Sequence, residues 1–246
     1  MLRAFALTLA ATAVAVAALA QGPVPSPDRV EEGVLKAAND FRADNHLKPL
    51  RPNAALAAEA RAFAQYLART GGFSHTADGR DPGERAQAAG YAYCALAENI
   101  AYESSSASFG EGRLVRLFMS GWEASPGHRR NLLDSSLAES GVGVASAAGP
   151  EQKYVAVHVF GLPITARYSF AIRNASQVTL GYRLGGEHRL LRPRETIVHT
   201  TCDAAELVFD GDGPGARRFP AEAGATYVLS QAPKGVQIEV LPEARP

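Results

Sequence analysis

Residues 122–133 read WEASPGHRRNLL and contain both the start of a short helix and a histidine in its first turn. Ser125 is a good N-cap, Pro126 is favoured as the first helical residue, and His128 then lies at the third position. The positive end of a helix disfavours a protonated imidazole, and a metal ligand or general base must be a neutral imidazole. A helix start with a surface histidine explains the same residues, so both interpretations stay open at this point.

The segments before residue 125 predict four more helices. Apolar residues recur there at helical spacing, and each of the first three segments begins with a residue that caps or starts helices. Glycines predict two of the ends, since Gly71 and Gly72 stop the second helix and the third runs to Gly90. The first three predicted helices begin at Asp28, near Pro52 and Asn53, and at the capping box Asp81-Pro82-Gly83-Glu84. The fourth contains Leu114, Phe118 and Trp122.

The pattern changes to strands after residue 140. Residues 142–148 and 153–160 alternate, with Val155, Val157 and Val159 on one face of the second strand. Helices followed by a small antiparallel sheet predict an α+β fold built in layers. Residues 165–246 contain only short strand-like runs, which predict a separate all-β domain, a small sandwich or barrel. These runs are 168–173, 178–184, 196–201, 206–210, 226–229 and 237–241.

The composition excludes some classes of protein. The chain has 246 residues, 46 % of them hydrophobic, which is enough for a packed core. It carries 25 Lys and Arg against 25 Asp and Glu, so the net charge gives no reason to expect nucleic-acid binding.

The first twenty residues predict a secretory signal peptide. Arg3 precedes an almost purely apolar run, Ala4–Ala20, which ends in small residues, and residues 21–27 form a Pro-rich linker. We expect cleavage near Ala20 and a secreted or periplasmic mature chain without a transmembrane segment. An uncleaved membrane anchor is the alternative, because the run is just long enough to span a bilayer.

Three residues could carry chemistry. His75 follows the predicted helix end at Gly71, on a loop between two helices. Glu98 follows an apolar stretch, so it is not expected to be freely solvated. Together with His128 they could form an open site for a divalent metal. Each also has a structural explanation, as a turn residue or as a carboxylate bonded to backbone donors. Motifs for a serine nucleophile elbow, a Walker loop or H-E-x-x-H are missing from the sequence.

Cys94 and Cys202 are the only two cysteines. Export would permit them to form a bridge between the two predicted domains. Two buried free thiols are the alternative, because a sequence does not supply the Cα separation that a disulfide demands.

Several motifs, in order, resemble the bacterial exported branch of the CAP superfamily, also called the SCP domain. They are Asn39-x-x-Arg42, Phe73-Ser74-His75, Glu84-Arg85, Ala89-Gly90-Tyr91, Ala97-Glu98-Asn99-Ile100, residues 122–133, Val142-Gly143-Val144 and residues 154–161. The resemblance covers about residues 28–162. It implies an α-β-α sandwich, the CAP domain, over residues 28–163, with the all-β domain following at 164–246.

The resemblance also implies a cleft that can hold zinc or another divalent metal. It assigns His75 and His128 as the histidine pair and Glu98 as the first acid. Animal and plant members place a second Glu where this chain has Ser125, and the nearest acid is Glu123, one residue after Trp122.

Three functions are compatible with this sequence. The first is a binding module for an apolar small molecule or a cell-envelope component, and the second is a metal-dependent, peptidase-like hydrolase that uses the same cleft. The third is a structural envelope protein. We favour binding over catalysis, because the resemblance comes without a nucleophile motif.

Overall fold

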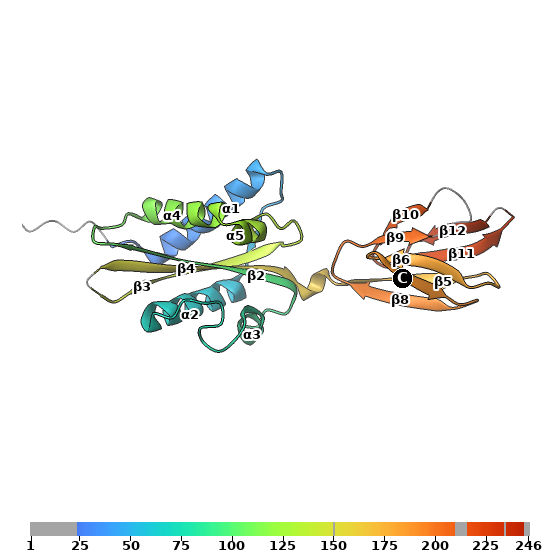
Figure 1. Ribbon diagram of the computed structural model, residues 1–246, viewed down its shortest axis with the longest axis horizontal. Coiled ribbons are helices and arrows are strands. Elements are labelled where there is room, and N and C mark those ends of the chain that lie inside the picture. The colour runs from blue at the N-terminus through green and yellow to red at the C-terminus, as the bar shows by residue number, and fades with distance from the viewer. Residues whose placement is uncertain (1–23, 150, 210–215, 234, 244–246) are drawn as a thin grey trace, which may run out of the picture.

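The computed structural model describes residues 24–149, 151–209, 216–233 and 235–243. The predicted signal peptide and residues 21–23 of the predicted linker lie outside the described residues. Within the described part, no helix is long and apolar enough to cross a membrane. Figure 1 shows a three-layer part, with helices above and below a sheet, followed along the chain by a part made only of strands.

The first sheet has the strand order β1-β3-β4-β2. β4 pairs antiparallel with β3 and β2, whereas the two-residue β1 runs parallel to β3, so the sheet is not purely antiparallel. β2 is an edge strand of this sheet. Its strands are β1 (Arg51–Pro52), β2 (Tyr93–Ser105), β3 (Glu139–Ala147) and β4 (Gln152–Pro163).

Helices cover both faces of this sheet (Figure 1). One face carries α1 (Pro27–Asp44), α4 (Glu111–Ala124) and α5 (Pro126–Leu132), and the other carries α2 (Ala54–Thr70) and α3 (Pro82–Ala88). The alternation predicted for β4 is confirmed, because Val155, Val157 and Val159 pack in the α2 core while Tyr154, Ala156 and Phe160 pack in the α1 core. The α+β class with an α-β-α sandwich is therefore correct.

The predicted helix signals are mostly confirmed. The Asn53 side chain accepts from two backbone N–H groups at the start of α2, and Gly71 ends that helix at φ 74°. The Asp81–Glu84 capping box forms both of its hydrogen bonds. Two boundaries were wrong: α1 begins at Pro27 after Ser26 rather than behind an Asp28 cap, and α3 ends at Ala88 rather than at Gly90. Proline suits the first helical position because its fixed φ matches and its missing N–H needs no partner there.

The C-terminal part contains two four-stranded sheets, ordered β10-β9-β6-β7 and β12-β11-β5-β8. Phe170 and Tyr227 of one sheet and Tyr182 and Phe209 of the other belong to one buried cluster. The two sheets therefore form a sandwich, one of the two predicted architectures. Its strands are β5 (Tyr168–Asn174), β6 (Leu180–Leu184), β7 (Glu187–Leu191), β8 (Thr196–Thr201), β9 (Glu206–Phe209), β10 (Arg217–Pro220), β11 (Thr226–Ala232) and β12 (Gly235–Leu241).

A disulfide joins Cys94, near the start of β2, to Cys202, just after β8, with the Cα atoms 5.7 Å apart. This is the bridge between the two parts, one of the two alternatives left open by the sequence. Between β4 and β5 the chain makes a short 3₁₀ turn, Ile164–Ala166. Pro163 is the last residue of β4 and Ile164 the first of this turn, and a boundary between two separable domains at this point stays a prediction.

Candidate functional site

Arg85 of α3 lies at the centre of the polar interior of the α-β-α part, and its side chain is only 3 % exposed. Its Nε donates to Glu59 Oε1 of α2 at 2.7 Å, and its Nη2 donates to Glu98 Oε2 of β2 at 2.5 Å. The guanidinium also lies over the Phe63 ring, 3.5 Å from its centroid. One cation therefore joins the second helix, the third helix and the edge strand.

Arg85 also holds the loop between α2 and α3. Its Nη1 donates to the backbone oxygens of His75 and Arg80, at 2.8 and 3.0 Å, and to Asp78 Oδ1 at 3.3 Å. Because these acceptors cover the residues from 75 to 80, the guanidinium fixes the path of the loop that carries His75.

The His75 side chain contacts Glu98 directly, with its Nδ1 2.7 Å from Glu98 Oε1. Glu98 is 1 % exposed and Arg85 occupies its second oxygen, whereas the His75 side chain is 47 % exposed. A carboxylate acceptor favours the tautomer with the proton on Nδ1, which leaves the lone pair on Nε2. The exposed side of the His75 ring can then accept a hydrogen bond or bind a ligand.

His128 lies at the start of α5, where Asn99 and Asn131 tie the helix to β2. Asn99 Nδ2 donates to the backbone oxygen of His128 at 3.1 Å, and Asn131 Nδ2 donates to Glu98 O and to Asn99 Oδ1. The pKa of His128 is lowered, first by burial and then by electrostatic interaction with the nearby His75. The His128 imidazole is thus neutral near pH 7 and lies within electrostatic range of His75.

A cavity of about 520 Å³ runs beside the first half of β2. His75 and Glu98 line it together with residues from the start of α3. The lining residues are His75, Asp81, Pro82, Gly83 and the strand residues 93–98. We call this cavity the β2 cleft. The Cys94–Cys202 disulfide lies at its wall, so the sandwich is attached at the edge of the cleft.

The sequence profile of the CAP family, the cysteine-rich secretory protein family, matches residues 35–160, just over half of the chain. The chain belongs to the CAP family. No curated protein matches the chain significantly. The β2 cleft, with His75 and Glu98 on its wall, lies within the matched residues.

Three solved structures are similar to the CAP part. An extracellular SCP-domain protein of Bacillus anthracis is 23 % identical over 55 % of this chain and 41 % of its own, with a TM-score of 0.45. A cysteine-rich secretory protein of Staphylococcus aureus is 23 % identical over 56 % and 40 %, with a TM-score of 0.40. An outer surface protein of Borrelia burgdorferi is 18 % identical over 55 % and 92 %, with a TM-score of 0.47. The chain thus spans less than half the length of the first two proteins.

Glu123 and Ser125, the other two predicted cleft residues of this CAP protein, lie where α4 ends and α5 begins. Glu123, in the last turn of α4, is half-buried, and its side chain forms no hydrogen bond or ion pair within the described residues. Ser125 is the N-cap of α5 as predicted, but its side chain makes no capping bond. Its backbone joins α4 to α5 instead, since its N–H donates to Gly121 O and its carbonyl accepts from Arg129 N.

The donor set does not match a complete metal site. Among the described residues, no group of three or more His, Cys, Asp or Glu side chains is arranged to hold an ion. Glu98 already engages both oxygens, with His75 and Arg85, so it serves to orient an imidazole. Two imidazoles are fewer than the three protein ligands of a catalytic zinc centre. That His75 and His128 share one ion stays a prediction.

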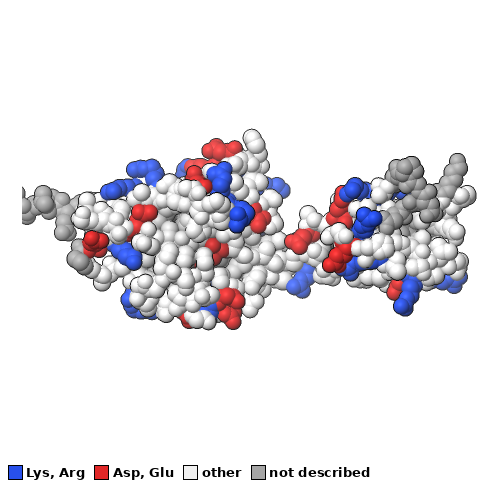
Figure 2. Space-filling view, in the orientation of Figure 1, with Lys and Arg blue, Asp and Glu red and all other residues white. Residues whose placement is uncertain are grey.

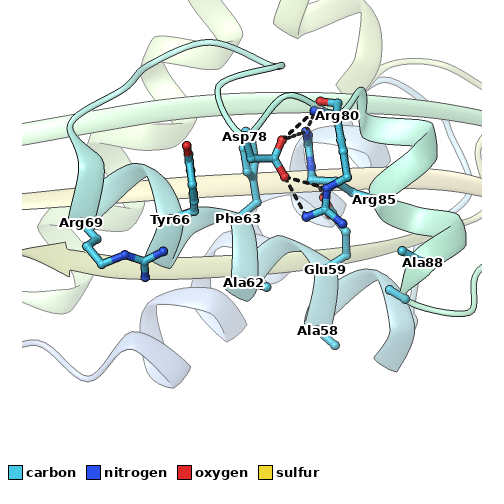
Figure 3. Close-up of a pocket in the computed structure, with 11 residues that line it drawn as sticks. Ala58, Glu59, Ala62, Phe63, Tyr66, Arg69, Asp78, Arg80, Arg85 and Ala88 are labelled. Atoms are coloured by element: carbon cyan, nitrogen blue, oxygen red, sulfur yellow. Dashed lines mark hydrogen bonds and ion pairs between the residues drawn. The ribbon is translucent and has the colours of Figure 1, made fainter.

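A second cavity of about 480 Å³ is lined by residues of α2, of α3 and of the loop between them, Arg85 among them (Figure 3). Figure 3 shows Asp78 between Arg80 and Arg85, with its carboxylate bonded to both. Glu59 lines this cavity. Its Oε2 is buried without a hydrogen-bond partner in the part of the chain that the structure describes, and burial raises the pKa of Glu59 to about 7. The Arg85–Glu98 pair therefore lies between the two cavities.

Sequence reasoning gave Arg85 and Glu59 no role. Glu84-Arg85 was part of the resemblance, but a lone arginine on a short helix carries no sign that it will be buried. The polar pair Asn99 and Asn131 was also inside quoted motifs without a stated purpose. Their function is to dock α5 on β2 beside Glu98.

Proposed function

We propose that this CAP protein is an exported binding module whose β2 cleft takes a cell-envelope component or an apolar small molecule. The observation that carries the proposal is the exposed His75 ring beside an open cleft, held by a fully engaged Glu98. Such an arrangement fixes the position of the imidazole, and it offers hydrogen bonding without a nucleophile.

Export is supported by two independent observations. The sequence begins with a predicted signal peptide, and the Bacillus relative is described as extracellular. Mass spectrometry of the protein from its own host tests the predicted cleavage near Ala20. An intact N-terminus would favour the uncleaved anchor.

Binding is tested with the full chain against phospholipid vesicles and whole cell-wall preparations. His75→Ala should weaken binding, whereas His46→Asn, at an exposed residue of the α1–β1 loop, should not. Retention on none of these preparations would contradict the proposal. Native mass spectrometry of the protein from its host would reveal a ligand that it retains.

The alternative is a metal-dependent hydrolase with His75 and His128 as ligands. It is favoured by one feature, the Glu98 contact that leaves Nε2 of His75 available. It predicts turnover that a chelator abolishes and His75→Ala removes. It also predicts that zinc binding, followed by titration calorimetry, is much weaker at pH 5 than at pH 7.5, because imidazole must be neutral to ligate.

A further inference from the structure

Two exposed aromatic rings touch each other beside the β2 cleft. Between residues 24 and 149, the large apolar side chains that stay well exposed are Val24, Phe73 and Tyr102. Phe73 is 44 % exposed and Tyr102 is 50 % exposed, and their ring centroids lie 4.9 Å apart at an interplanar angle of 83°. The two rings form a right-angled corner on the surface, which we call the aromatic corner.

The aromatic corner is built from the same loop and the same strand as the candidate site. Phe73 precedes His75 by two residues on the same loop. Tyr102 follows Glu98 by four residues on β2, so it lies on the same face of the sheet, on the order of 13 Å further along the strand. The β2 cleft and the aromatic corner therefore lie along the same face of the edge strand.

A lysine side chain lies against the aromatic corner. Lys153 Nζ of β4 lies 4.7 Å from the centroid of the Tyr102 ring. Lys153 has no ion pair with another described residue, and the nearby Glu103 alternates to the opposite face of the sheet. A ligand on Tyr102 therefore meets the positive charge of Lys153, which favours an anionic group.

Three kinds of occupant can be compared. A peptide strand would pair with the free edge of β2, but Asn131 Nδ2 and Trp122 Nε1 already bind the carbonyls of Glu98 and Ile100. An acyl chain requires an enclosed apolar cavity, whereas the aromatic corner is open and borders a lysine. A sugar ring stacks its apolar face on an exposed aromatic ring and keeps its hydroxyl groups in water.

We propose that Phe73, Tyr102 and Lys153 form a carbohydrate subsite for a sugar ring that carries a carboxylate, within a cell-wall glycan chain. The remainder of the chain extends along β2 toward His75. This inference rests on the proposed binding function and names its ligand class. The two rings supply the stacking surface, and Lys153 pairs with the carboxylate.

The experiment measures retention of the full chain on two probes. The first is peptidoglycan glycan strands stripped of their stem peptides, which leaves a free lactyl carboxylate on alternate sugars. The second is the same strands with those carboxylates converted to amides. The wild type should bind the first probe about tenfold more tightly than the second, and Lys153→Gln should remove that difference.

Substitutions of the rings test the stacking. Phe73→Ala and Tyr102→Ala should each weaken binding about tenfold, whereas Tyr102→Phe should keep it. Val198→Ala is the matched control, because Val198 is a 65 % exposed residue of the sandwich. Thermal unfolding of each variant shows that a loss of binding is not a loss of fold.

The outcomes separate this subsite from the proposed function. Binding of the first probe that survives both alanine substitutions overturns the subsite. Binding to whole cell walls or phospholipid vesicles, without binding to the stripped strands, overturns the subsite and leaves the proposed function standing. Binding to none of these preparations overturns both.

Discussion

Arg85 Nη2 lies 2.5 Å from Glu98 Oε2, while Nε of the same guanidinium lies 2.7 Å from Glu59 Oε1. All three side chains are at most 3 % exposed. A buried cation between two buried carboxylates couples the fold to the site, because the guanidinium that joins α2 to α3 through Glu59 also fixes Glu98, the acid that holds His75.

The first prediction concerns the removal of this cation. Arg85→Leu leaves Glu59 and Glu98 buried without their common partner, and breaking a buried ion pair in this way costs about 3–5 kcal/mol. We expect a loss of that size in the free energy of unfolding, measured with urea. Arg218→Ala, which breaks the exposed pair with Glu206, should change stability by less than about 1 kcal/mol. A similar loss for both variants would contradict the central role of Arg85.

The second prediction is a pH dependence that comes from Glu59. Its pKa is about 7 in the folded chain, raised mainly by burial, against 4.5 as the ordinary value. Below pH 4.5 the carboxyl is protonated in both states. As the pH rises toward 7 the unfolded chain ionises first, so stability on the order of 3 kcal/mol is lost.

Glu59→Gln tests this, because an amide does not titrate. Relative to the wild type, the variant should gain about 3 kcal/mol of unfolding free energy between pH 4.5 and pH 8. Glu32→Gln, at an exposed position of α1, is the control and should show no such gain. Parallel pH profiles for Glu59→Gln and the wild type would rule out an uncharged Glu59.

The third prediction is acid destabilisation by His158. This residue of β4 is fully buried in contact with the Trp122 and Phe160 rings, and among the described residues neither ring nitrogen has a hydrogen-bond partner. Burial, aided by the charge of Arg42, lowers its pKa to about 3. The unfolded chain binds the proton near pH 6.5, so stability that is complete above that pH declines as the pH falls toward 3.

The loss from His158 should reach about 4 kcal/mol by pH 3. His158→Leu should flatten the acid side of the stability profile by that amount, and His46→Asn should leave it unchanged. If the free energy of unfolding fell equally steeply in acid for His158→Leu and the wild type, groups other than His158 would cause the loss.

The parts of the fold that follow local rules could be predicted from the sequence. Asn53, Gly71 and the Asp81–Glu84 box act within a few residues of chain, and the structure confirms each. β2 was missed although it is 13 residues long. Only Glu98, Asn99 and Ile100 of this strand are buried, and its apolar and small residues follow one another without the alternation that marks a half-exposed strand.

The candidate site could be predicted only in part, because some of its contacts join residues that lie far apart in the sequence. His75, Glu98 and His128 were found through the family motifs. The role of Arg85 depends on Glu59 and Glu98, which lie 26 and 13 residues away on other elements. β7 and β10 were also missed, because each is short and mostly exposed.

The fourth prediction concerns the connection between the two parts of the chain. We expect residues 21–163, with Cys94→Ser, to unfold cooperatively when expressed alone, because their two hydrophobic clusters contain no residue beyond 160. In the full chain the Cys94–Cys202 bridge closes 108 residues, so its reduction should cost up to about 4–5 kcal/mol by chain entropy. Thiol titration of the unfolded, unreduced protein should find no free thiol. A molten fragment would mean that the sandwich completes the first core.

The last prediction concerns the contact that places α2, and with it Glu59, on the sheet. A Cβ atom at Gly141 of β3 would overlap the backbone of Leu56 and Ala57 in α2, and backbone cannot move aside as a flexible side chain can. Gly141→Ala should therefore cost about 3 kcal/mol or more of unfolding free energy. It should also shift α2 away from the sheet, which lengthens the Glu59–Arg85 contact and loosens Glu98.

The matched control is Gly121→Ala in α4, where a Cβ meets nothing within 4 Å and alanine should stabilise the helix by up to about 1 kcal/mol. Urea denaturation measures both variants, and ligand retention measures the effect on the cleft. If Gly141→Ala were as stable as the wild type, α2 would not be held by this close approach.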